Sequence, residues 1–184
     1  MERGIVMKEI SFAAGELLLT VTWIIIRMAC RIRKGRIDWK REALLMLMYI
    51  NLAVIIRFAF YPFSRVNSQV QPLIFDPENV FPLRINLIPF VHLLEYDSRK
   101  DLLINMLGNC GMFIPSGIIL PVIYKKLDTF GKVTAAGILL SLCIEIAQLP
   151  FAIRATDIDD LILNTLGVMA GYGIYRLIKG RKKR

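Results

Sequence analysis

The sequence predicts an all-α fold, a polytopic bundle of about five helices that span a membrane. The 184 residues are 55% hydrophobic with a mean hydropathy of +0.53, more apolar side chain than one soluble core of this size can bury. Apolar runs of about 20 residues recur, the length that a helix needs to cross the hydrocarbon of a bilayer. Basic residues collect in short clusters between these runs, which excludes the continuous basic surface of a nucleic-acid-binding protein. We therefore expect the protein to reside in the lipid bilayer and to bind no nucleic acid.

The candidate spanning segments are residues 10–30, 43–63, 102–124, 133–153 and 158–178. The first is the weakest, because Glu16 and Arg27 leave an uninterrupted apolar stretch of only Leu17 to Ile26. An interfacial helix is its alternative. No small-residue cleavage site follows this stretch, so we expect it to be retained. The expected regions are an N-terminal helix with its basic connection, one transmembrane domain and a basic tail, at residues 1–41, 42–178 and 179–184.

The basic clusters predict the orientation, because Lys and Arg accumulate on the cytoplasmic side of short connections. They occupy residues 31–41, residues 125–132 and the tail from Arg176 onward. With five helices these three clusters share one side. We therefore expect a multi-pass membrane protein with its N-terminus outside and its C-terminus in the cytoplasm. The outer connection, residues 64–101, is rich in proline, so we expect it to be irregular or partly re-entrant.

Polar side chains inside the spanning segments are the main functional signal. Each costs about 3 kcal/mol on insertion scales, so such residues usually face partners or a wet cavity. Several stand three or four positions apart, on one helix face. The predicted topology places seven at a similar depth near the outer surface: Asn105, Asn109, Glu145, Gln148, Asp157, Asp160 and Asn164. Arg57 and Arg154 supply cations at the same level.

Two interpretations of these residues stay open. One is a polar pocket in the outer leaflet, with carboxylates held by arginine and amide partners. In the other, Thr156 and the aspartates up to Asp160 cap the last helix, the asparagines join helices, and Gly167 with Gly171 forms a close-packing face. We favour the pocket, because neither capping nor packing explains Glu145 below the surface.

The sequence offers little for established enzyme or metal chemistry. His92 is the only histidine, and no serine-nucleophile motif accompanies it, so no hydrolase triad is visible. Glu145 and the aspartates could bind a hard cation, but nothing resembles a known metal loop, and we expect no metal or other cofactor. Cys30, Cys110 and Cys143 lack metal-ligand spacing and are interpreted as small buried hydrophobic residues.

The order of several short motifs resembles the VanZ-like family of bacterial membrane proteins over roughly residues 40–178. These motifs are Asn86 to Phe90, Asn105 to Asn109, Phe113 to Gly117, Leu120-Pro121, Glu145 to Gln148, Arg154, Asp157 to Asp160, Asn164 to Gly167 and Gly171-Tyr172. Ser116 departs from the pattern, where the family often has a bulkier or apolar residue. The family is named for a member linked to low-level resistance to teicoplanin, a lipid-tailed glycopeptide, and the resemblance implies a role in the cell envelope.

Two functions are compatible with these observations. In the first, the outer pocket engages a lipid-linked cell-wall component or the lipid tail of the antibiotic without catalysis. Its ligand-binding residues would be Asn86, Asn105, Asn109, Glu145, Gln148, Arg154, Asp157, Asp160, Asn164 and Arg57. In the second, an intramembrane enzyme acts on a lipid-linked precursor, with Glu145 and either Asp157 or Asp160 as acid and base. The sequence leaves the native ligand and the oligomeric state open.

Overall fold

Five long helices dominate the part of the chain that the structure describes. The computed structural model describes residues 8–34, 37–61, 65–66, 69–76, 85–91, 98–151 and 156–181. Its long helices are α1 (Phe12–Lys34), α2 (Trp39–Phe60), α4 (Arg99–Ile123), α5 (Phe130–Gln148) and α6 (Ile158–Arg181). All five are long and apolar enough to cross a membrane, which confirms the predicted fold class.

α2, α4 and α5 begin three or four residues before the predicted spans, whereas α1 begins two residues later and α6 begins as predicted. Polar caps precede the apolar parts of α2 and α4. Asp38 accepts hydrogen bonds from the backbone N–H groups of Lys40 and Arg41, at 3.1 and 3.2 Å, and so starts α2. Ser98 accepts from the backbone N–H of Lys100 at 3.2 Å and starts α4. α5 ends at Gln148, five residues before the predicted boundary, where the chain turns before Pro150.

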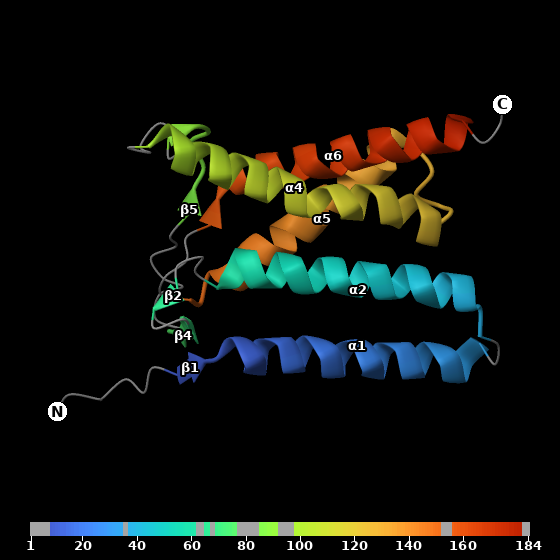
Figure 1. Cartoon of the computed structure of the whole chain (residues 1–184), viewed down its shortest axis with the longest axis horizontal. Coiled ribbons are helices and arrows are strands. Elements are labelled where there is room, and N and C mark those ends of the chain that lie inside the picture. Colours follow the sequence, from blue (N-terminus) through green and yellow to red (C-terminus); the bar gives the residue numbers. More distant parts are fainter. Residues whose placement is uncertain are drawn as a thin grey trace.

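Short strands gather at one end of the bundle, which we call the strand end (Figure 1). β1 (Lys8–Ile10) pairs antiparallel with β4 (Leu73–Phe75), and β2 (Arg65–Val66) pairs antiparallel with β3 (Gln69–Val70). β5 (Ile85–Asn86) pairs in parallel with β6 (Thr156–Asp157). The described parts of the outer connection are thus built from strand pairs that the sequence did not predict.

The opposite end, which we call the basic end, holds the α1–α2 connection, the α4–α5 loop and the C-terminus of α6 (Figure 1). The described residues of all three predicted basic clusters therefore lie at the same end of the bundle, as the orientation argument requires. Which side of the membrane this end faces stays a prediction.

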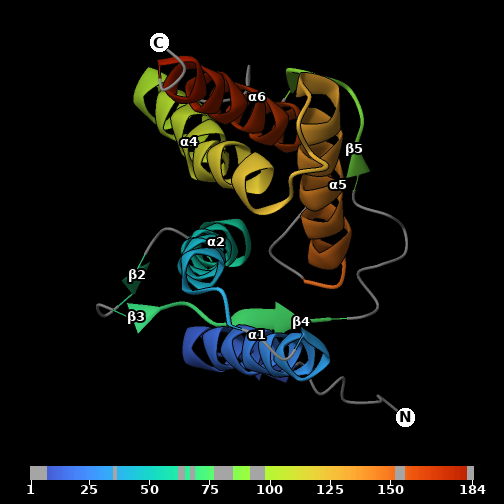
Figure 2. The ribbon, with the colours of Figure 1, turned by 90° about the vertical axis from the view of Figure 1, so that its right-hand side faces the viewer.

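α4 and α6 form the most extensive helix pair, α5 crosses α6, and α2 lies between this group and α1 (Figures 1 and 2). A Cβ on Gly167 would overlap the carbonyl oxygen of Cys110, and one on Gly171 would overlap that of Ile114. A Cβ on Gly117 would overlap the carbonyl oxygen of Val168. The glycine stripe of α6 therefore packs within the bundle, and the backbones of α4 and α6 nearly touch.

The inner packing joins four helices in one apolar cluster, formed by Ile55, Phe113, Val133, Val168 and Tyr172. The interpretation of the cysteines as buried was wrong for Cys143, which is exposed on α5, while Cys30 and Cys110 are half-buried. An exposed position on an apolar helix is compatible with a small thiol because the surrounding solvent is hydrocarbon rather than water.

α1 attaches to the other helices through polar contacts at three heights. The Tyr61 hydroxyl donates to the Ser11 carbonyl at 3.2 Å, the Thr20 and Tyr49 hydroxyls are 2.8 Å apart, and Arg27 pairs with Glu42. No residue of its most apolar window is buried, so its apolar side chains remain available to lipid. This helix lies beside α2 in the opposite chain direction, in accord with a spanning segment (Figure 1).

Candidate functional site: a polar cavity beside an apolar groove

Four helices enclose a small polar cavity of about 90 Å³ near the strand end. Its described lining consists of Phe58, Ala59, Asn105, Asn109, Met112, Phe113, Ile144, Glu145, Gln148, Asp160 and Asn164. Every amide and carboxyl residue in this list was named from the sequence. The structure therefore brings six predicted residues to one place, although their role in binding stays a prediction.

Asn109 is the polar link between α4 and α6. Its Nδ2 donates to Oδ1 of Asn105, one turn away at 3.3 Å, and to Oδ1 of Asp160 on α6. The spacing of four residues predicted a shared face for the two asparagines, and this hydrogen bond confirms it. The carboxyl group of Asp160 is thereby held at the cavity wall by an amide.

Glu145 and Gln148 form the polar part of the cavity wall that α5 contributes. Glu145 is 2% exposed, and its Oε2 accepts a hydrogen bond from the backbone N–H of Asp157 at 3.2 Å. The Glu145 carbonyl accepts from the Thr156 hydroxyl at 2.9 Å. Gln148 donates through Nε2 to the Ala59 carbonyl on α2. The same two side chains that line the cavity therefore also fasten α5 to its neighbours.

Two buried acceptors on cavity residues have no hydrogen-bond partner, Oε1 of Gln148 and Oδ1 of Asn164. Leaving a buried acceptor unpaired costs about 1–3 kcal/mol, so each calls for a donor. A volume of about 90 Å³ accommodates water or a small donor group such as a hydroxyl or an amine. The cavity is too small for a whole drug-sized ligand, whose pockets measure roughly 300–1,000 Å³.

Asp157 follows the capping interpretation, whereas Asp159 binds the loop that precedes α4. Oδ1 of Asp157 accepts from the backbone N–H of Asp159 at 3.0 Å and from Nδ2 of Asn86 at 3.1 Å. Asp159, 3% exposed, accepts from the backbone N–H of Phe90 at 2.7 Å. Phe90 has a φ of 69°, a left-handed conformation that a non-glycine residue adopts only when its surroundings hold it. These contacts clasp the Asn86–Phe90 loop onto the start of α6.

The two predicted cations are not among the described lining residues. Arg57 donates through Nη1 to the Tyr61 carbonyl at 3.2 Å, and its guanidinium lies over the rings of Phe12 and Phe58, at 5.5 and 5.4 Å from the centroids. It therefore points toward α1 while its neighbour Phe58 lines the cavity. Arg154 lies outside the described residues, as does His92.

Sequence reasoning missed a polar clasp between α2 and α4. Asn51 donates through Nδ2 to the Met112 carbonyl at 2.8 Å, and its Oδ1 accepts from the fully buried Ser116 hydroxyl at 2.6 Å. Ser141 is similarly hidden and accepts from Nδ2 of Asn164 at 3.0 Å. Asn51 could have been singled out from the sequence, because it is an amide inside a predicted spanning segment, as Asn105 and Asn109 are.

A larger groove of about 790 Å³ runs along α2 and α4 next to the cavity. Its described lining is Val54, Phe58, Lys100, Asp101, Ile104, Asn105, Leu107, Gly108, Asn109, Gly111 and Met112, four of which also line the cavity. A Cβ on Gly108 or Gly111 would meet no atom within 4 Å. These glycines do not serve helix packing, and the missing side chains leave the groove open.

An apolar five-helix bundle with a polar cavity buried among four of its helices defines a multi-pass membrane protein with a site inside the bundle. Among the described residues no group of three or more His, Cys, Asp or Glu side chains is placed to hold a metal ion. The chain belongs to the VanZ/LLP1 family, whose model matches residues 44–179. The matched region includes every described residue of the cavity and the groove, and it confirms the resemblance seen in the sequence.

A curated relative is Protein VanZ of Enterococcus faecium, which is 44% identical over 72 residues. The alignment covers 39% of this chain and 44% of the relative, so the chain matches less than half the length of that protein. No solved structure matches the fold.

Proposed function

We propose that this protein contributes to resistance against teicoplanin-type glycopeptides by engaging a lipid-linked cell-wall component, or the antibiotic's lipid tail, at the outer leaflet. A hydrocarbon chain would lie in the groove between α2 and α4, and a polar group next to the chain would enter the cavity. The observation that carries the proposal is the junction of the two spaces, which share Phe58, Asn105, Asn109 and Met112. Membership of the VanZ/LLP1 family supports a role of this kind.

The chemistry of each part suits one part of such an amphiphile. The groove wall is mainly apolar, with Lys100 and Asp101 at the strand end of α4. An ammonium at this position attracts a phosphate or carboxylate, and the amides of Asn105 and Asn109 can hydrogen-bond to sugar or peptide groups. The unpaired acceptors of Gln148 and Asn164 favour a hydroxyl or amine deeper in the cavity.

Filling the groove tests the proposal without breaking the fold. Gly108→Leu and Gly111→Leu each add a side chain where no atom lies within 4 Å of the new Cβ, and leucine favours the helix more than glycine does. Cells that express either variant should become as susceptible to teicoplanin as cells without the protein. Gly173→Leu is the matched control on α6, since its Cβ also meets nothing within 4 Å, and it should keep protection.

Membrane abundance of each variant is measured by blot, so that lost protection is not confused with lost protein. Unchanged protection in both groove variants would contradict a role for the groove. If the intact protein itself gives no protection, the teicoplanin role fails and the native task in the envelope lies elsewhere.

Glu145→Gln tests the charge of the cavity separately. Glutamine keeps the size and an acceptor oxygen for the backbone N–H of Asp157, so the α5–α6 contact can persist. Loss of protection at equal abundance would show that the carboxylate itself acts. Equal protection would make Glu145 a structural residue and leave the groove as the functional part.

One observation favours the enzyme alternative, namely that Glu145 and Asp160 line the same cavity. A carboxylate pair in a small polar space can serve as acid and base. Purified protein incubated with a panel of polyprenyl-linked compounds would then change the mass of at least one. Absence of any product across the panel would contradict catalysis and leave the binding function in place.

A further inference from the structure

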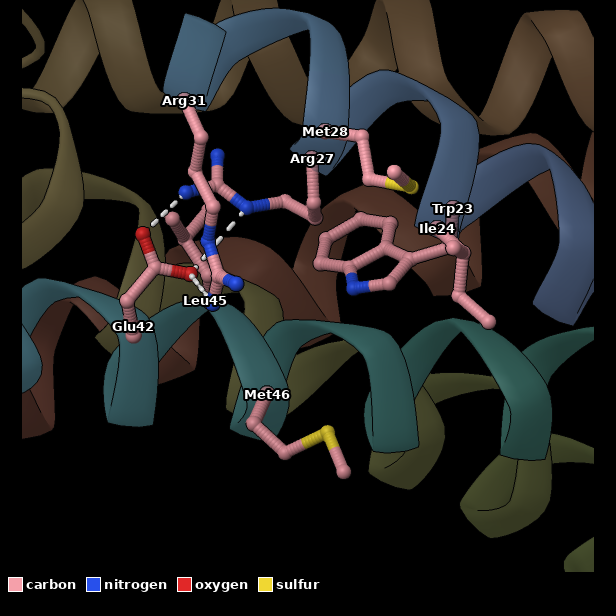
Figure 3. A pocket seen from close by; sticks show the side chains of 8 residues that line it. All are labelled: Trp23, Ile24, Arg27, Met28, Arg31, Glu42, Leu45 and Met46. Carbon is pink, nitrogen blue, oxygen red and sulfur yellow. Dashed lines mark hydrogen bonds and ion pairs between the residues drawn. The ribbon is translucent and has the colours of Figure 1, made fainter. Parts of the chain in front are cut away.

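A second cavity lies at the basic end, on the other side of the molecule from the polar cavity. It measures about 320 Å³ and lies between α1 and α2 (Figure 3). Its described lining is Trp23, Ile24, Arg27, Met28, Arg31, Glu42, Leu45 and Met46. Most of these residues precede residue 44, where the family match begins, so family membership assigns this cavity no role.

Three charged side chains form the polar wall of this cavity. Arg27 pairs with Glu42, and both side chains are largely buried. Arg31 reaches the same carboxylate with a separation of 3.6 Å, but half of its side chain is exposed. Figure 3 shows both guanidiniums converging on Glu42 from α1. Two cations share one carboxylate, so the wall keeps a net positive charge, carried mainly by the accessible Arg31.

The remaining lining is apolar, and all of it but the buried Leu45 and the partly buried Trp23 is exposed. Ile24, Met28 and Met46 are each at least half exposed, and Trp23 stands beside them in the cavity (Figure 3). The cavity therefore combines a cationic end with an apolar slope, in a helix pair that is apolar enough to lie in a bilayer.

We propose that this cavity is a binding site for one anionic phospholipid. The phosphate lies on the Arg31 guanidinium, which matches phosphate oxygens with a planar pair of donors. One acyl chain lies along Ile24, Met28 and Met46. Glu42 acts as the positioning residue that holds both guanidiniums at the cavity wall. A net negative lipid is favoured over a zwitterionic one, because basic pockets between helices at a membrane surface select anionic headgroups.

Trp23 provides a reporter inside the site. The chain has two tryptophans, and Trp39 is 74% exposed, so Trp39→Phe leaves Trp23 as the fluorophore without disturbing packing. The Trp39→Phe full-length protein is placed in phosphatidylcholine vesicles that contain increasing fractions of brominated phosphatidylglycerol or brominated phosphatidylcholine. Bromine on the acyl chains quenches Trp23 only when a chain lies next to it. We expect about fivefold preferential quenching by phosphatidylglycerol, the effect of one basic residue near the surface.

Arg31→Gln in the Trp39→Phe background should reduce this preference to about equal quenching by the two lipids. Arg33→Gln is the matched control, because it removes the same charge from an exposed position of α1 that does not line the cavity. It should keep the preference. Equal quenching by both lipids in the parent, an unchanged preference in Arg31→Gln, or an equal loss in Arg33→Gln would each overturn the site.

Discussion

At the scale of single residues, the four acidic side chains near the strand end divide between two tasks, two of them holding the start of α6 or its neighbouring loop and two lining the cavity. Asp157 caps α6 and binds Asn86, and Asp159 holds the Phe90 loop. Asp160 and Glu145 line the cavity. Capping and cavity lining were treated as competing interpretations of one stretch, yet neighbouring residues on a helix point about 100° apart, so adjacent side chains can serve both.

The buried hydrogen bond between Ser116 and Asn51 leads to a prediction about the free energy of unfolding. Ser116→Ala removes the hydroxyl that donates to Oδ1 of Asn51, and the serine is fully buried. Hydrogen bonds between membrane helices contribute about 0.6 kcal/mol on average and up to about 1.7 kcal/mol, so we expect a loss within this range. Reversible unfolding in mixed micelles measures the free energy.

The same measurement on Asn51→Ala and on the double variant isolates the pair. The two losses should not add, because either change already breaks the Ser116–Asn51 bond. Additive losses would show that the hydroxyl stabilises the fold through another contact.

At the scale of elements, the close packing of α4 and α6 requires glycine, which has no side chain, at the contact positions. Gly167→Ala brings a Cβ against the backbone carbonyl of Cys110, which cannot rotate away as a side chain would. Such overpacking typically costs about 1–3 kcal/mol. Thermal unfolding in detergent should therefore occur at a lower temperature for this variant than for the parent.

Gly173→Ala is the control on the same helix, because its Cβ would meet nothing within 4 Å. Alanine favours the helix by up to about 1 kcal/mol over glycine, so this variant should be as stable as the parent or slightly more stable. Equal destabilisation by both changes would mean that glycine is required along the whole helix rather than at the α4 contact.

At the scale of the whole molecule, the shared basic end leads to a prediction of topology. Green fluorescent protein fused after Arg184 should fluoresce, because it folds to a fluorescent state in the cytoplasm, and alkaline phosphatase fused after Asp76 should be active outside. This follows from the accumulation of Lys and Arg on the cytoplasmic side. The reverse pattern, an inactive phosphatase and a dark C-terminal fusion, would show that the bundle is inserted the other way round.

The number and type of helices could be predicted because bilayer thickness sets the length of an apolar run. Their ends could not, since caps such as Asp38 and Ser98 are polar and lie outside that run. The strand pairs were missed for a different reason. β5 and β6 are two residues each and are separated by about 70 positions along the chain, so no local periodicity announces their pairing.

The candidate site was partly predictable for similar reasons. Depth along a helix follows from residue count, so six amide and carboxyl residues could be placed near one level, and they do line one cavity. Depth does not determine direction. Arg57 lies at the same level but turns toward the Phe12 ring, and Asp157 turns to the loop. The groove was invisible in the sequence, because a glycine that opens a groove and one that packs a helix look alike.

The contrast between the two helix contacts of α4 has a mechanical consequence. α6 is joined to α4 along its length by backbone contact at Gly117, Gly167 and Gly171, so the two should move as one rigid body. α2 is pinned to α4 at Asn51, and the groove lies between this pin and the strand end. Gln148 of α5 ties the strand end of α2 as well, through the Ala59 carbonyl. A lever motion of α2 about Asn51 that widens the groove therefore requires the Gln148–Ala59 hydrogen bond to open first.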